Sequence, residues 1–208
     1  MSIYEMTMND YLALVASKSP TPGGGSVSAV AAANAAAMIS MVANLTLKKK
    51  GYEAVQTQVE GILERATQAI EKLKDLTGQD MQAFESLMTA WRLPSGNDEQ
   101  KEIRAEALGK AAQEASAVPL EICNVCLEVL KLANDLAPIG NKNAISDVGV
   151  AVYLAEASLK AAMLNVDINL QSIMDEAYKS HLISQEGRLL SEADELKISA
   201  IGKVEARL

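Results

Sequence analysis

Apolar residues recur at steps of three and four along most of this chain, the spacing that places side chains on one face of an α-helix. No segment shows the alternating pattern of a half-buried β-strand convincingly. The clearest helical stripe predicts one long helix or a broken pair over residues 53–91. Its members are Val55, Val59, Ile62, Ala66, Ile70, Leu73 and Leu76, followed by Met81, Phe84, Leu87, Met88 and Trp91.

A second long helix is predicted by an uncharged run of 21 residues from Val27 to Leu47. At about 1.5 Å per residue such a helix is long enough to cross a bilayer. Eight of its residues are alanine, five are polar, and no aromatic belt flanks the run. These features favour a central helix packed inside a bundle over a membrane span, because small side chains let neighbouring helices approach closely.

Capping and turn residues delimit the elements around this run. Thr7 is the expected N-cap of a first helix that ends near Ser17, and residues 18–25 form a loop because of their prolines and glycines. Ser26 is the expected N-cap of the Ala-rich helix. Lys48–Gly51 is expected to end it, since cations are favoured at a helix C-terminus.

The second half of the chain also predicts helices. Asn97 and Gln100 form a capping pair for a helix that ends near Val118, and Pro119 is expected to open the next helix, which ends before Pro138. A further helix is expected over residues 146–164, an interruption at 165–169, and a last helical stretch, in one or two parts, over 171–205. The predicted fold class is therefore all-α: a single-domain helical bundle of residues 1–208 around a long Ala-rich central helix.

The composition narrows the classes of function. The net charge of −8 argues against a general nucleic-acid binder, because such a protein needs a basic face. Two cysteines and one histidine are too few for a disulfide-built secreted domain or a conventional zinc site. The first ten residues lack the basic start of a signal peptide, so a cytoplasmic location is the default expectation.

Gly23, Gly24, Gly25 and Ser26 form the most unusual segment. Glycine permits backbone shapes that are closed to other residues, and the first amides of the following helix point back towards this loop. Such a junction can hold a carboxylate or a phosphate on backbone N–H groups. A flexible turn with a serine cap explains the same residues, so both interpretations stay open.

Charged and amide side chains give further candidates. Lys48–Lys50 form a solvated helix end, attract an anionic tail, or do both. Asp147 lies near a predicted helix start, where a carboxylate either complements the helix dipole or serves as a general acid or base. Several asparagines, with Asp80 and Asp167 as weaker candidates, pair either with one another or with the edge of a polar heterocycle. These asparagines are Asn34, Asn44, Asn141, Asn143, Asn165 and Asn169.

The two cysteines, Cys123 and Cys126, have C-x-x-C spacing. They lie inside a predicted helix among apolar residues, and the chain offers no second pair, so core packing is favoured over metal binding or redox chemistry. His181 has polar neighbours, is expected at the surface and receives no role.

Several short segments occur together, in order, over roughly residues 6–173: Pro20–Ser26, Val42–Thr46 with the lysines after it, Asp80–Phe84, Leu93–Pro94, Ala117–Leu120, Gly140–Asn143, Ser146–Ala151 and Asn165–Asn169. In this order and spacing they resemble the cyclodeaminase/cyclohydrolase family of folate enzymes. The resemblance implies an all-α fold, a homodimer, and tetrahydrofolate derivatives as substrates, with no metal or redox cofactor.

The resemblance also implies roles for individual residues. The family's proposed proton donor, the aspartate of a Ser-Asp motif, falls on Asp147. Substrate binding is assigned to the glycine-rich loop, the lysines and the asparagine motifs: Gly23, Gly24, Gly25, Ser26, Asn44, Lys48, Lys49, Lys50, Asn141, Asn143, Asn165 and Asn169.

The leading expectation is a methenyltetrahydrofolate cyclohydrolase, which converts 5,10-methenyltetrahydrofolate and water to 10-formyltetrahydrofolate by general acid/base catalysis. The alternative is a formiminotetrahydrofolate cyclodeaminase, which forms 5,10-methenyltetrahydrofolate and releases ammonia. A non-catalytic helical folate-binding or scaffold protein, and a membrane-embedded bundle, are further alternatives. The chain is too short for an added formiminotransferase domain, and neither a nucleic-acid nor a membrane partner is expected.

Overall fold

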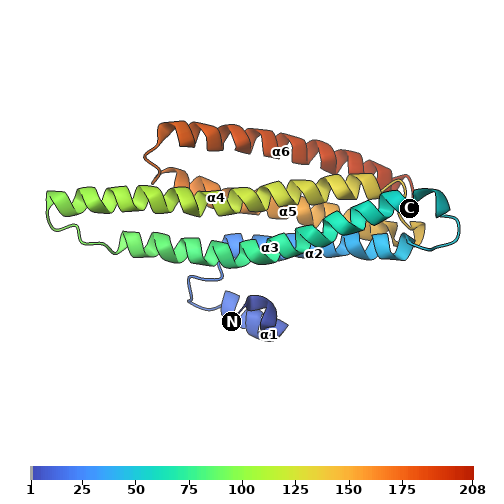
Figure 1. The fold of residues 1–208 in the computed structure, drawn as a ribbon, viewed down its shortest axis with the longest axis horizontal. Coiled ribbons are helices and arrows are strands. Elements are labelled where there is room, and N and C mark those ends of the chain that lie inside the picture. The colour runs from blue at the N-terminus through green and yellow to red at the C-terminus, as the bar shows by residue number, and fades with distance from the viewer. Residues whose placement is uncertain (1) are drawn as a thin grey trace.

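The structure, a computed structural model, describes residues 2–208, and within them it contains six α-helices and no β-strand. The five long helices, α2 to α6, lie side by side in an elongated bundle, and the short α1 projects from its side (Figure 1). The predicted all-α class is therefore confirmed. The helices are α1 (Met8–Val15), α2 (Gly24–Thr46), α3 (Gln56–Trp91), α4 (Asp98–Leu136), α5 (Ile145–Leu170) and α6 (Glu176–Glu205). Short 3-10 helices occupy Ile3–Glu5, Glu53–Val55 and Lys142–Ala144.

The Ala-rich helix α2 is buried where it meets the other helices and exposed on its outer face at Ala37, Met41 and Leu45. It packs against α3 and α5, these two pack against α4, and α6 covers α4 and α5. Ala29, Ala32, Ala36 and Ala43 are fully buried on α2, because a methyl side chain lets the neighbouring helices approach closely. Among the described residues α2 is the one helix that is long and apolar enough to cross a membrane by length and composition, and 56% of its most apolar window is buried inside the bundle.

The predicted helix break at Pro119 is wrong, because α4 runs through this proline without interruption. Proline has no N–H for the carbonyl four residues earlier, which is that of Ala115. Asn169 of α5 supplies the missing donor: its Nδ2 lies 3.2 Å from the Ala115 carbonyl oxygen. A partner from another helix thus stabilises a proline that the sequence alone marks as a helix start.

The predicted interruption at residues 165–169 is also wrong, since α5 continues to Leu170. The amide of Asn165 donates to the carbonyl of Ala161 (3.0 Å), and the amide of Asn169 donates to the carbonyl of Asn165 (2.9 Å). Both side chains therefore bond back along the helix rather than ending it.

The predicted caps at Thr7 and Asn97 are confirmed, because each side chain accepts a hydrogen bond from a backbone N–H three residues later. Residues 53–91 form one long helix after a short 3-10 turn. The last helix is also a single piece, and the side chain of Asp175 caps its start.

Cys123 and Cys126 are fully buried in α4, as core packing predicts. Burial raises the pKa of the Cys123 thiol to about 12, which makes it a poor nucleophile. His181 is exposed on α6, also as predicted.

Candidate functional site

A cavity of about 420 Å³ opens where the start of α2 meets α3, α4 and the end of α5. The glycine-rich loop forms one wall, Asp80 and Phe84 of α3 form another, and the end of α5 closes the side. We call it the loop site. Its polar lining includes Gly23, Gly24, Gly25, Asp80, Asn165 and Asn169.

Gly25 and Asp80 approach so closely that a side chain at position 25 would force one of them to move. A Cβ atom placed on Gly25 would lie 2.2 Å from Oδ1 of Asp80. The next residue, Ser26, donates a hydrogen bond of 2.6 Å from its hydroxyl to Oδ2 of the same carboxyl group. The expectation that Ser26 is the N-cap is therefore wrong: α2 begins at Gly24 after the N-cap Gly23, and Ser26 is buried within the first turn, facing Asp80.

Asp80 has the electrostatics of a general acid or base. Burial raises its pKa above the usual aspartate value, and hydrogen bonds from the hydroxyl and backbone N–H of Ser26 partly oppose that rise. Within residues 2–208 it forms no salt bridge, so no cation holds it ionised. A carboxyl group with a raised pKa at the wall of a cavity is suited to exchanging protons with a bound molecule.

Two asparagines of α5 present acceptor oxygens in the same cavity. The Nδ2 atoms of Asn165 and Asn169 are committed to backbone carbonyls. Their Oδ1 atoms receive no hydrogen bond from the described part of the chain, and Oδ1 of Asn165 lies 3.2 Å from where a Cβ on Gly24 would be. The predicted binding residues Gly23–Ser26, Asn165 and Asn169 are thus brought together, beside an acid.

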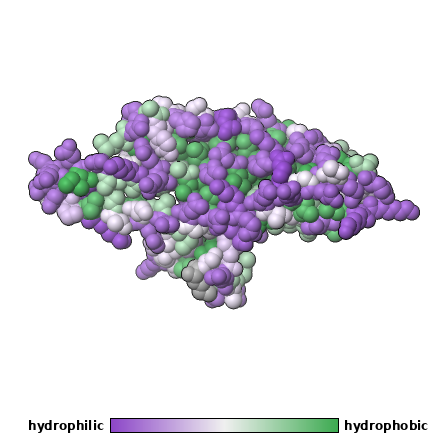
Figure 2. All heavy atoms as spheres, in the orientation of Figure 1, coloured by the Kyte–Doolittle hydropathy of each residue, from purple (hydrophilic) through white to green (hydrophobic). Residues whose placement is uncertain are grey.

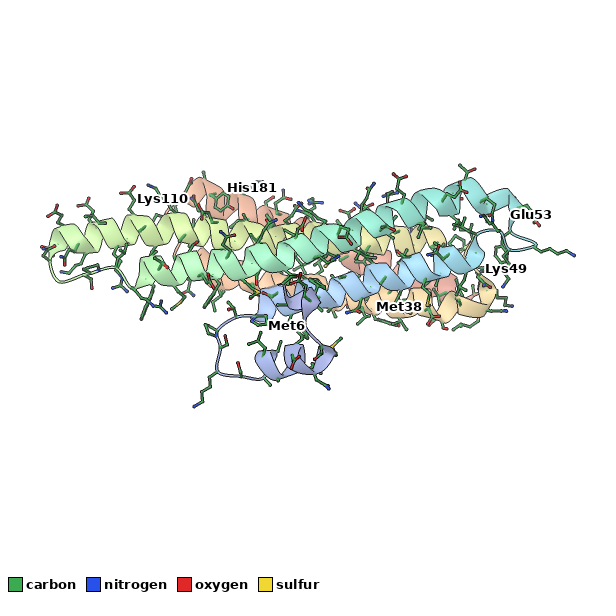
Figure 3. All side chains as sticks on the ribbon, turned by 60° about the horizontal axis from the view of Figure 1, so that its bottom comes forward. Met6, Met38, Lys49, Glu53, Lys110 and His181 are labelled. Atoms are coloured by element: carbon green, nitrogen blue, oxygen red, sulfur yellow. The ribbon has the colours of Figure 1, made fainter. Side chains whose placement is uncertain are left out.

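The remaining predicted residues form a second group, the lysine end, at the other end of α2. It comprises Asn44, Lys48, Lys49, Lys50, Asn141, Asn143 and Asp147. Lys49 donates to Oδ1 of Asn141 over 2.7 Å, and the same oxygen accepts from the backbone N–H of Asn143 over 3.1 Å. Figure 3 shows Lys49 beside Glu53 at this end, far from the end that carries Lys110 and His181. Asn44, Lys48, Lys50 and Asn143 are exposed.

Asp147 lies in the first turn of α5, half-buried, at the lysine end. The 23 residues of α2 span about 33 Å at 1.5 Å per residue, so within one chain Asp147 and the loop site are far apart. Its role as proton donor remains a prediction.

From the sequence alone Asp80 was only a weak candidate, although it continues the buried stripe of α3 that contains Ile62 and Leu76. A carboxyl group at a core position is the signal that identifies it.

Comparisons with known proteins identify the family. Residues 7–186 match the family model described as formiminotransferase-cyclodeaminase. A methenyltetrahydrofolate cyclohydrolase of Methylorubrum extorquens is 40% identical over 190 residues, which is 91% of each protein. A formimidoyltransferase-cyclodeaminase of Sus scrofa is 32% identical over 206 residues, which is 99% of this chain and 38% of that longer protein.

The fold is also similar to a solved structure. A crystal structure of formiminotetrahydrofolate cyclodeaminase from Thermotoga maritima superimposes with a TM-score of 0.88 at 33% sequence identity, over 98% of both chains. The family-model match over residues 7–186, the relative that is 40% identical and the shared helical fold lead to one conclusion: this protein belongs to the formiminotransferase-cyclodeaminase family.

Proposed function

We propose that this protein is a methenyltetrahydrofolate cyclohydrolase, which hydrolyses 5,10-methenyltetrahydrofolate to 10-formyltetrahydrofolate at the loop site. The observation that carries the proposal is the Asp80 carboxyl, which has a raised pKa and is held between Ser26 and a cavity large enough for part of a folate. The cyclohydrolase of Methylorubrum extorquens, similar over 91% of both chains, supports this substrate.

The chemistry requires one group that first accepts a proton and then returns it. Water attacks the carbon that bridges N5 and N10, and the ionised Asp80 takes one proton from that water as the C–O bond forms. The C–N5 bond then breaks, Asp80 delivers its proton to N5, and the second proton of the water leaves to solvent as the formyl C=O forms. A positioned acid/base of this kind contributes about 10²–10⁴-fold in rate. The reaction so written uses no metal or redox cofactor.

The other walls of the loop site suit a pterin ring. The backbone N–H groups of Gly24 and Gly25, in the first turn of α2, have no partner within their own helix, and both residues line the cavity. The oxygens of Asn165 and Asn169 can accept the N–H groups of a polar heterocycle. Donors and acceptors on facing walls would hold the ring so that the reacting carbon lies near Asp80.

We also propose that the protein acts as a homodimer that packs through α2 and α5. An uncharged stripe of exposed side chains runs along α5, where Val150, Tyr153, Leu164 and Ile168 are 45%, 56%, 68% and 74% exposed. Met41 and Leu45 are exposed on α2. The face over α3, α4 and α6, by contrast, is mainly hydrophilic (Figure 2). Exposed apolar side chains that line up along one helix face are typical of protein interfaces.

A two-fold axis across the middle of α5 would join the two groups of predicted residues. In a two-fold dimer both subunits use the same surface to form the interface. The start of α5 in one subunit therefore lies beside the end of α5 in the other. The lysine end of each subunit, with Asp147, would then lie next to the loop site of its partner. This arrangement accounts for predicted site residues that are about 33 Å apart along α2 in a single chain.

The second candidate activity is that of a formiminotetrahydrofolate cyclodeaminase, which the similarity to the Thermotoga maritima enzyme favours. N10 attacks the formimino carbon on N5, and an acid protonates the departing ammonia. Asp80 suits this step as well, since both reactions pass through a tetrahedral carbon between the same two nitrogens.

The test is to add purified protein to 5,10-methenyltetrahydrofolate and follow the loss of its near-ultraviolet absorbance against the spontaneous rate. Protein-dependent loss with formation of 10-formyltetrahydrofolate is expected. An unchanged rate, together with ammonia release from 5-formiminotetrahydrofolate, would replace the first candidate with the second. If neither substrate reacts, the protein is not an enzyme of this chemistry.

A further inference from the structure

The core-facing stripe of α3 extends beyond the helix that covers it. Leu73 and Leu76 are buried against the bundle, and Asp80 lies where α2 begins. The same helical face continues through Phe84 and Leu87 to Trp91, three to four residues apart. Figure 1 shows the joined ends of α3 and α4 reaching past the start of α2. Phe84 and Leu87 line the loop site, whereas Trp91 is 59% exposed.

The facing stripe of α4 continues in the same direction. Ala115 lines the loop site, and Leu108 and Arg104 follow on the same face towards the helix start. The Arg104 guanidinium lies 5.3 Å from the centre of the Trp91 ring, so the two uncovered stripes end in a stacked aromatic and cation.

Arg104 is held in place without an anionic partner. Its Nη1 donates to the hydroxyl of Ser95 over 3.2 Å. Its Nε is buried and has no hydrogen-bond partner among residues 2–208. The nearby cations Lys101 and Lys110 each pair with an acid one turn away, whereas Arg104 forms no salt bridge within the described chain. A buried donor without an acceptor is rare, and a planar guanidinium is the group that best matches a carboxylate.

The nearby glutamates of α4 itself do not share the face of Arg104. Glu99, Glu102 and Glu106 fall on the opposite side of α4 from Arg104 by helical register. Arg104 lies on the face of α4 that carries Ala115, which lines the loop site three turns further along the helix.

We infer that Trp91 and Arg104 form the binding site for the aminobenzoylglutamate tail of the folate substrate. The inference rests on the proposed function, since it extends the same site. The 11 residues from Asp80 to Trp91 rise about 16 Å along α3. Along that length the lining changes from an acid to the apolar Phe84 and Leu87 and then to a cation. The substrate has the same order: a reacting carbon, a benzoyl ring and the glutamate carboxylates.

The test compares two substrates that differ only in the glutamate. Turnover is measured with 5,10-methenyltetrahydrofolate and with the corresponding methenyltetrahydropteroate, which lacks the glutamate. In Arg104→Gln we expect KM for the glutamylated substrate to rise about 10-fold or more with little change in kcat, as for loss of a charge-assisted hydrogen bond. KM for the pteroate should stay as in the wild type.

Two matched variants complete the experiment. Arg92→Gln removes an exposed arginine one residue after Trp91 and should leave both KM values unchanged. Lys49→Gln tests the lysine end as the rival site for the tail. The inference is overturned if Arg104→Gln changes KM equally for both substrates, or for neither, or if Lys49→Gln alone discriminates between them.

A binding measurement separates this inference from the proposed reaction. Calorimetry with 5-formyltetrahydrofolate requires no turnover. Weaker binding by folded Arg104→Gln than by the wild type supports the tail site even if the wild type hydrolyses no methenyltetrahydrofolate. Equal affinity for the two proteins overturns it.

Discussion

The hydroxyl of Ser26 lies 2.6 Å from Oδ2 of Asp80 and donates a hydrogen bond to it, joining the first turn of α2 to the middle of α3 across 54 residues of sequence. This bond keeps the carboxyl group at the wall of the loop site. It also favours the ionised form of an acid whose pKa is raised by burial. The pair therefore sets both the position and the protonation of the proposed catalytic group.

Replacing Ser26 should change how activity depends on pH. Burial raises the pKa of Asp80, and the Ser26 hydroxyl lowers it, so Ser26→Ala should raise that pKa further. The ionised carboxyl takes the first proton from water, so kcat/KM rises with pH through this pKa. The acid limb of the kcat/KM profile should therefore move to higher pH in Ser26→Ala. Ser40→Ala, which removes a hydroxyl bonded within α2, is the matched control and should leave the limb in place. If the acid limb lies at the same pH in the wild type, Ser26→Ala and Ser40→Ala, the Ser26 hydrogen bond does not set the pKa of Asp80.

Gly25→Ala should damage both the site and the fold. The new Cβ would lie 2.2 Å from Oδ1 of Asp80, so either the helix start or the carboxyl group must move. Overpacking of this kind costs about 1–3 kcal/mol of unfolding free energy, and turnover should fall with it. Gly61→Ala is the control: Gly61 is exposed on α3, and its added Cβ meets nothing within 4 Å. That variant should gain about 0.5–1 kcal/mol in urea unfolding and keep full activity. A Gly25→Ala protein as stable and active as the wild type would contradict the close approach.

The bond between Asn169 and the Ala115 carbonyl predicts a rescue experiment. Asn169→Leu leaves that carbonyl without a donor and should lower the unfolding free energy by about 1–3 kcal/mol. Pro119→Ala restores a backbone N–H four residues after Ala115, so the double variant should recover part of this loss. Denaturant unfolding of the four proteins measures the coupling. Strictly additive effects would mean that Asn169 does not compensate for the proline.

The proposed dimer predicts which exposed residues matter. Leu164→Glu places a charge within the apolar stripe of α5 and should give a monomer in sedimentation. The same monomer should lose activity, because the lysine end of a partner would no longer reach the loop site. Ile198→Glu changes a residue on α6 that is 71% exposed, and it should alter neither property. A fully active Leu164→Glu monomer would show that each chain carries a complete site.

Much of the fold could be predicted because helical periodicity is local. The spacing of apolar residues in α3 and the uncharged run of α2 indicate directly that these helices are largely buried. Pro119 and Asn169 misled the prediction for a physical reason: the proline is tolerated because a side chain from another helix replaces its missing N–H. That pairing depends on how α4 and α5 pack, which single-sequence periodicity does not contain.

The site could be predicted only in part for the same reason. The glycine-rich loop can be recognised from its composition. Its partner Asp80, however, lies 54 residues from Ser26 in the sequence, so the contact between them depends on how the helices pack. The resemblance grouped Asp147 with the loop site, yet α2 and α5 carry them to opposite ends of a single chain. Motifs in matching order indicate a shared family, whereas distances between them follow from the packing of the helices.

The most direct test of the account is the rate of methenyltetrahydrofolate hydrolysis by folded Asp80→Asn, measured beside the wild type and Asp147→Asn. Asn at position 80 keeps an acceptor for Ser26 but cannot exchange protons, so turnover should fall about 10²–10⁴-fold. Asp147→Asn should cause a smaller loss than Asp80→Asn. Full turnover by Asp80→Asn, together with its loss in Asp147→Asn, would contradict the account and return the catalytic role to Asp147.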